Sequence, residues 1–180
     1  MTYPHNLLTH LVHLVRRFLG SLWPGGPAAG DDAWATAQLL PGEVDLWRQM
    51  SAADRRHAVG VARRTAAELG DAATRPVLAA ALLHDVGKVA SGFGPWRRAI
   101  ATVVGAVAGH QRAERWRSEG PAPLARVGRY LCHDAIGADL LAAAGSDPLT
   151  VTWAREHHLA PERWTLPAPV GVALKVADDD

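Results

Sequence analysis

The residues of this sequence best suited to chemistry are histidines and aspartates, and one segment, residues 82–88, joins a histidine directly to an aspartate. His84 and Asp85 follow an apolar run that begins at Pro76, and Gly87 and Lys88 come directly after them. We expect the run to be a helix that Gly87 ends, with the pair in its last turn. Adjacent helical side chains point about 100° apart, so the pair can approach one ion, or two neighbouring ions, from different sides. The Lys88 ammonium suits an anionic substrate.

Histidine is unusually frequent, with nine in the chain and six of them between His57 and His158. A single histidine beside an apolar stripe is more often structural than ligating, but several come with aspartates at positions that helical spacing turns inward. An inward carboxylate needs a partner, because burying an unpaired charge is costly. The candidate ligands are His57, His84, Asp85, His133, His157, His158 and Asp178.

This candidate set contains imidazoles and carboxylates but no thiolate, which suits Mn, Fe, Co, Ni, Zn or Mg better than a closed structural zinc site. Seven ligands are too many for one ion that keeps open positions. We therefore predict two divalent ions, about 3.5–4 Å apart and bridged by a carboxylate, which would generate a nucleophile at neutral pH and neutralise an attacked phosphate.

The elements that must position these residues all have helical apolar spacing, and no strand pattern is present. Ser51 and Asp54 give a capping start to a helix that stops at Gly70, and Asp147-Pro148 starts another. The sequence predicts an all-α fold. The expected helices cover 33–40, 43–50, 51–69, 76–87, 130–144, 148–158 and 170–178.

The N-terminal part divides from the rest at a run rich in proline and glycine. Residues 1–23 have amphipathic helical spacing with interspersed histidine and arginine, and residues 24–32 are typical of a flexible linker. Residues 33–180 would then form the metal-binding helical domain. The first helix is expected to pack on this domain or on a second subunit, or to lie on a membrane surface; it is a poor signal peptide.

Residues 92–120 differ from the rest in combining apolar helical spacing with flanking arginines. The uncharged stretch 99–109 is about half the length that spans a bilayer. We expect an ordinary packing helix, with a lid, a dimer face or an interfacial helix as alternatives, and we do not expect His110 to be a ligand.

Charge and cysteine usage limit the partners and the compartment. The chain has 19 Lys and Arg against 18 Asp and Glu, so bulk charge does not favour a nucleic acid polymer. The single cysteine, Cys132, excludes an internal disulfide and fits a reducing cytoplasm. A homodimer and peripheral contact with a membrane remain open.

His57, the pair His84-Asp85 with Gly87-Lys88, and Asp178 together resemble the HD-domain phosphohydrolase superfamily, over about residues 50–180. His133 in His133-Asp-Ala-Ile-Gly137, followed by His157-His158, looks like the HD-GYP branch and related two-metal proteins. The resemblance implies a helical bundle in which His57, His84, Asp85 and Asp178 hold one metal. It further implies that Asp85 bridges to a second metal held by His133, His157 and His158, and that Lys88 assists with the phosphate.

The sequence departs from that family pattern in three places. The Gly-Tyr-Pro segment associated with cyclic dinucleotide recognition is replaced by Leu159-Ala-Pro-Glu-Arg-Trp, and Ala53 stands where some members have a glutamate for a third metal. The chain also ends at Asp180, two residues beyond the last expected ligand, with no helix expected after it. A register shift of one or two residues would make Asp179 or Asp180 the last ligand in place of Asp178.

The expected function is therefore hydrolysis of a small phosphoester, a nucleotide or a cyclic dinucleotide, by a metal-dependent enzyme with Asp85 and Lys88 as catalytic residues. A regulatory domain that binds a nucleotide or metal without turnover is the main alternative, motivated by the missing Gly-Tyr-Pro segment. A di-iron oxygenase is a third.

Overall fold

The computed structural model describes residues 25–179, and these residues form ten α-helices and three short 3-10 helices without any strand. The all-α prediction is confirmed for this part of the chain, whereas the expected helix at 1–23 lies outside it. The elements are α2 (Ala29–Ala37), α3 (Pro41–Gln49), α4 (Ala52–Leu69), η1 (Gly70–Ala72), α5 (Arg75–Leu83), η2 (Val86–Ser91), α6 (Pro95–Ala108), α7 (His110–Glu119), α8 (Ala122–Leu131), α9 (His133–Ala143), α10 (Pro148–Glu156), η3 (Pro161–Arg163) and α11 (Ala168–Asp179).

Helix α5 is the centre of the core. Its residues Val77–Leu83 are all buried, as expected for a helix that is apolar on every side. Helices α4, α10, α11 and α3 pack around it. The largest fully buried side chains of this core are Trp47, Trp153, Leu82, Leu83, Leu141 and Leu174. A helix surrounded in this way is fixed on all sides, so residues at its C-terminal end are held in place by the whole core.

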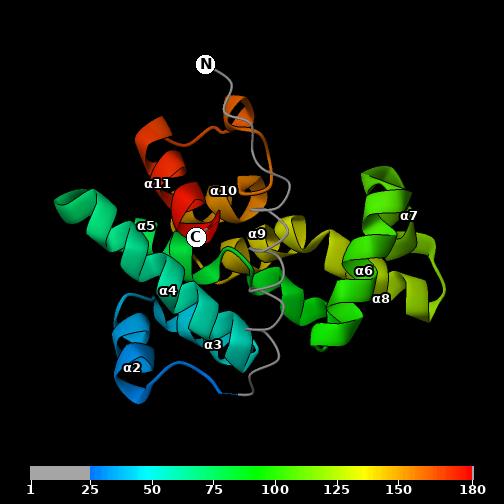
Figure 1. Ribbon diagram of the computed structural model, residues 1–180, viewed down its shortest axis with the longest axis horizontal. Helices are drawn as coiled ribbons and strands as arrows, with labels where there is room; N and C mark the ends of the chain where they lie inside the picture. The colour runs from blue at the N-terminus through cyan, green and yellow to red at the C-terminus, as the bar shows by residue number, and fades with distance from the viewer. Residues whose placement is uncertain (1–24, 180) are drawn as a thin grey trace, which may run out of the picture.

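Helices α6, α7 and α8 form a lobe beside this core, on the right of Figure 1. The lobe is joined to the core through η2, against which α8 packs. Arg126 of α8 donates hydrogen bonds to the carbonyls of Ser91 and Gly92, and Arg98 of α6 binds the carboxylate of Asp54 through contacts of 2.6 and 2.7 Å. The residues expected to be one insert, 92–120, thus belong to a packed three-helix unit.

Several helix ends agree with their local sequence signals. Helix α4 begins after Ser51, whose hydroxyl accepts a hydrogen bond from the Asp54 amide. Helix α10 begins at Pro148, and the Asp147 carboxylate accepts a hydrogen bond from the Leu149 amide. These caps form within three residues along the chain, so sequence alone predicts them.

Other predicted boundaries were wrong near the N-terminal end of the described chain. Helix α2 begins at Ala29, so residues 29–32 are helical rather than linker, with Asp31 and Asp32 in the first turn, where the helix dipole favours acidic side chains. Pro41 starts α3 instead of separating two helices, because proline fits the first turn and the Glu43 carboxylate accepts a hydrogen bond from the Leu40 amide at 2.7 Å.

The remaining corrections concern breaks inside expected helices. The helix expected to run to Gly87 ends at Leu83, and residues 92–120 contain two helices separated by Gly109, whose φ is +77°. The helix expected over 130–144 breaks at Cys132, so that His133 begins α9. Apolar periodicity continues across each break, so only the packing of the following segment reveals it.

No helix among residues 25–179 combines the length and the apolarity required to cross a bilayer.

Candidate metal centre

All seven predicted ligands lie together at the C-terminal end of α5, although five different helices bring them there. His84 and Asp85 directly follow α5, while His57 comes from α4 and His133 from the start of α9. His157 and His158 follow α10, and Asp178 lies in the last turn of α11. The structure arranges six of the seven as two groups of three ligands, with Asp85 between them.

The first group consists of His57, His84 and Asp178. The Nε2 atom of His57 lies 2.9 Å from Oδ1 of Asp178, and the Nε2 atom of His84 lies 3.5 Å from that same oxygen. Ligand atoms that bind one metal at about 2.1 Å are separated from each other by about 3 Å, so these spacings fit a single ion. His84 and Asp178 are buried, whereas the His57 side chain is one-quarter exposed.

The second group consists of His133, His157 and His158, and every member is an imidazole. The Nε2 atoms of His133 and His158 face each other at 3.1 Å. The Nδ1–H of His133 donates to the Tyr130 carbonyl, so its Nε2 carries a lone pair when the ring is neutral. Two imidazole nitrogens that converge in this way can share a cation between them.

Asp85 contacts both groups through different oxygens of one carboxylate. Its Oδ2 lies 3.5 Å from Nε2 of His84, in the first group. Its Oδ1 lies 3.2 Å from Nε2 of His133 and 3.8 Å from Nε2 of His157, in the second group. A carboxylate in this position can bind one ion with each oxygen, so the two groups can act as one centre.

Backbone hydrogen bonds orient three of the histidines toward this centre. The Nδ1–H groups of His84, His133 and His157 donate to the carbonyls of the residues three positions earlier, at 2.8–2.9 Å. Such bonds fix the ring and leave Nε2 as the ligating atom. The buried Nε2 atoms of His84 and His157 have no hydrogen-bond partner among residues 25–179, which is costly unless another group binds them. The donor set therefore fits a metal ion.

The electrostatics of the centre are those of two buried carboxylates that require positive charge. Burial would lower the pKa of His84, but the carboxylates of Asp85 and Asp178 outweigh it and raise that pKa to about 10. Burial would likewise raise the pKa of Asp85, but Lys88 and then His84 hold it well below its usual range. Lys88 and a protonated His84 thus supply the positive charge that a metal cation would otherwise bring.

The second group has the opposite electrostatic character. Burial, followed by the neighbouring imidazoles of His158 and His84, holds the pKa of His157 well below its usual range. Partial burial of the ring and the nearby His133 lower the pKa of His158 to about 4. Both rings are therefore neutral at pH 7, which is the protonation state that binds a metal.

Among the described residues, Lys88 contacts a side chain of the centre, whereas Asp179 does not. The Lys88 ammonium contacts Oδ2 of Asp85, and its side chain is mostly buried. Asp179 instead pairs with Lys175 at 2.8 Å and is exposed, so within the described chain it is Asp178 that joins the ligand group. His110, which was not expected to be a ligand, is exposed and lies 3.8 Å from Glu114.

Sequence reasoning missed three neighbours of the centre. The Tyr130 ring stacks on the His133 ring at a centroid distance of 6.0 Å. Burial would lower the pKa of Lys88, but Asp85 and then Asp54 raise it, and Asp54 is itself bound by Arg98. Asp54 precedes His57 by three residues on one helix, a spacing that could have revealed it, whereas nothing in the sequence marks Arg98.

Comparison with protein-family models, with curated proteins and with solved structures found no match to this chain.

Proposed function

We propose that this protein is an HD-type, metal-dependent phosphohydrolase that acts on a small phosphoester, with nucleotides and cyclic dinucleotides as the substrate class. The observation that supports this most is the contact of Asp85 with both ligand groups, at 3.5 Å on one side and 3.2 Å on the other. That arrangement suits a pair of divalent ions, which hydrolytic centres use on phosphate esters.

In this proposal His57, His84 and Asp178 hold the first ion, and His133, His157 and His158 hold the second. Asp85 contributes one oxygen to each. When bound, such ions lower the pKa of a water molecule and neutralise charge on the phosphate. The identity of the ions stays open among Mn, Fe, Mg, Co, Ni and Zn, because availability and geometry decide it as much as ligand type.

In this proposal the protein orients the imidazole ligands, keeps two of them neutral and places a positive charge beside Asp85. The backbone bonds to Nδ1 hold three imidazoles in fixed orientations. The low pKa values of His157 and His158 keep those rings neutral. Lys88 lies against Asp85, and an ammonium there would stabilise the charge that develops on a phosphate oxygen during hydrolysis.

The test combines metal analysis with a substrate panel. Protein purified without oxygen is analysed for its metals and then assayed on nucleotides, cyclic dinucleotides and bis-p-nitrophenyl phosphate. We expect bound transition metal and turnover in the wild type, and a rate lower by at least about 1,000-fold in His84→Ala. His110→Ala removes an exposed histidine outside the centre and is expected to retain both metal and activity.

Two results would contradict the proposal. A metal-free protein that hydrolyses nothing in the panel would remove its basis. Nucleotide binding by metal-loaded protein, measured by calorimetry and followed by no product, would instead indicate a regulatory domain.

A further inference from the structure

Helix α6 of the lobe has two apolar faces, and within residues 25–179 only one of them is packed. On the packed face Ala101 is buried, and Gly105 lies so close to Leu131 of α8 that an added Cβ would come within 2.4 Å of that side chain. On the opposite face Ile100, Val103 and Val107 are 65%, 67% and 86% exposed. A helix that is apolar on both sides normally has a second surface to bury against.

The exposed apolar residues form one stripe rather than scattered positions. Ile100, Val103 and Val107 follow the i, i+3, i+7 spacing that places side chains on one side of a helix. The stripe spans about 10 Å at 1.5 Å per residue. Trp96, 65% exposed, lies one turn before Ile100. This is the geometry of a helix that lies along an apolar boundary.

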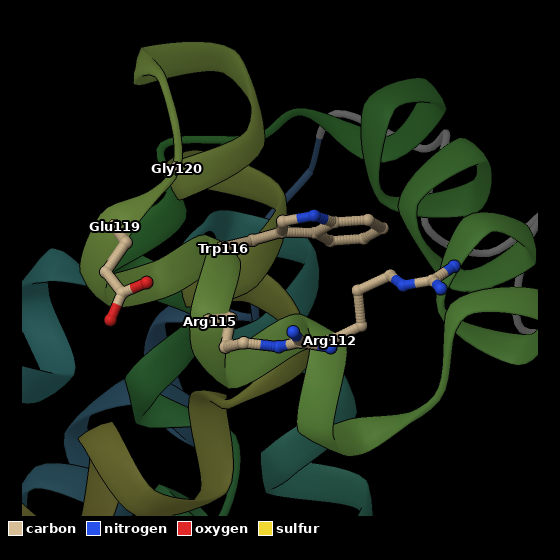
Figure 2. A pocket seen from close by; sticks show the side chains of 5 residues that line it. All are labelled: Arg112, Arg115, Trp116, Glu119 and Gly120. Atoms are coloured by element: carbon tan, nitrogen blue, oxygen red, sulfur yellow. The ribbon is translucent and has the colours of Figure 1, made fainter.

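The lobe that carries the stripe is strongly basic. Residues 95–131 contain seven arginines and two glutamates, a formal charge of +5, while the whole chain has +1 and the rest therefore has −4. On α7 the side chains of Arg112, Arg115, Trp116 and Glu119 line a surface hollow that contains none of the candidate ligands. Figure 2 shows Trp116 and Arg112 extending to one side of α7 and Glu119 to the other.

Charge distinguishes between the surfaces that could cover the stripe. A second copy that docks through the same helix would place one +5 lobe against another. Residues 1–24 contain Arg16 and Arg17 but no acidic residue, so that segment is also a poor electrostatic match. An anionic bilayer offers an apolar layer for the stripe and negative headgroups for the arginines.

We propose that α6 docks on an anionic lipid bilayer, with Ile100, Val103 and Val107 in the headgroup–acyl boundary and with the exposed Arg97 of α6 and the arginines of α7 at the headgroups. The inference does not depend on the proposed phosphohydrolase activity, because no ligand of the metal centre lies on α6 or α7.

The test is co-sedimentation of the full chain with vesicles of phosphatidylcholine, with and without about 30% phosphatidylserine. The wild type is expected to bind the anionic vesicles at least about tenfold more strongly than the neutral ones, and more weakly in high salt. Val103→Glu/Val107→Glu is expected to weaken binding at least about tenfold. The matched control is Val172→Glu/Val176→Glu, which changes two valines on α11 that are 51% and 55% exposed and is expected to bind like wild type.

A second measurement does not depend on the acidic variants folding. A Val107→Cys protein carries an environment-sensitive dye at residue 107, and the native Cys132 is buried and therefore protected from labelling. We expect a blue shift of the dye on adding anionic vesicles. No shift, or equal vesicle binding by wild type and Val103→Glu/Val107→Glu, would overturn the proposal. A dimer in sedimentation equilibrium that this double variant dissociates, without vesicle binding by the wild type, would identify a second copy as the occupant and also overturn it.

Discussion

At the scale of single residues, Asp85 and Asp178 differ from the other acidic side chains near the centre because both are buried against imidazoles. Asp178 lies within 2.9 Å of His57 Nε2, and Asp85 contacts both ligand groups. Their negative charge is balanced by Lys88 and a protonated His84. A bound cation would displace at least one of those protons, so metal binding and protonation are coupled here.

Two adjacent aspartates give a direct test of the first ligand group. Asp178→Asn removes the charge and one ligand oxygen, and we expect metal affinity to fall at least about 100-fold. Asp179→Asn affects only the exposed pair with Lys175 and should leave affinity unchanged. The metal dissociation constants of both variants are measured by competition with a coloured chelator. Equal effects of the two substitutions would show that Asp178 is not a ligand.

The lowered pKa of His158 predicts how the stability of metal-free protein depends on pH. His158 is neutral in the folded state down to about pH 4, whereas in the unfolded chain it takes up a proton below its ordinary pKa of 6.5. The unfolded state therefore binds more protons between pH 6.5 and 4, so stability falls as the pH falls through that range. His157, with its pKa lowered in the same direction, adds to this loss.

The measurement is the melting temperature of EDTA-treated protein between pH 4 and pH 7. His158→Gln should reduce the number of protons taken up on unfolding by up to about one and flatten the pH dependence. His110→Gln, at an exposed histidine, is the control and should leave the slope unchanged. If His158→Gln does not alter the slope of the melting temperature against pH, the His158 ring is not neutral in the folded state.

At the scale of elements, the 3-10 helix η2 shows why the chain turns directly after the His-Asp pair. Gly87 packs so closely on α9 that an added Cβ would come within 1.9 Å of the His133 carbonyl oxygen and 2.6 Å of the Gly137 nitrogen. From the sequence, this glycine was expected to end a helix, but its missing side chain instead allows two backbones to meet. That close approach holds Asp85 beside His133.

A substitution at this glycine should therefore affect both stability and metal binding. Gly87→Ala is expected to lower the free energy of unfolding by about 2–3 kcal/mol, since the new Cβ overlaps backbone that cannot move aside. It should also weaken metal binding by displacing His133. Gly30→Ala, in α2 with nothing within 4 Å of the added Cβ, should not destabilise the protein. Urea unfolding and chelator competition check both expectations, and equal stabilities would contradict this packing argument.

At the scale of the whole molecule, the candidate metal centre draws its side chains from five helices that are distant in sequence. The ligands come from α4, from the end of α5, from α9, from the end of α10 and from α11. A ligand that binds only the folded chain stabilises it by mass action. The lobe of α6–α8 contributes none of these ligands, although His133 follows α8 by two residues.

Removal of metal should consequently lower the thermal stability of the whole protein. A site at a free metal concentration 100 times its dissociation constant contributes about 2.7 kcal/mol. For a chain of this size each kcal/mol corresponds to about 2–4 °C, so EDTA is expected to lower the melting temperature by about 5–10 °C. Calorimetry with and without EDTA checks this, with His84→Ala as a variant that EDTA should affect less. An unchanged melting temperature in the wild type would argue against bound metal.

The sequence by itself determined the all-helical class, the caps of α4 and α10, and the residues that could ligate metal. These follow from apolar periodicity and from hydrogen bonds between residues no more than four positions apart, which are properties of a local stretch. The division into two ligand groups with Asp85 between them was expected only from the family resemblance. The tertiary structure decided which atoms meet, with separate oxygens of Asp85 facing the two groups, and that Asp178 rather than Asp179 belongs to the first group. Those contacts join residues up to 121 positions apart, and they depend on how whole helices pack around α5.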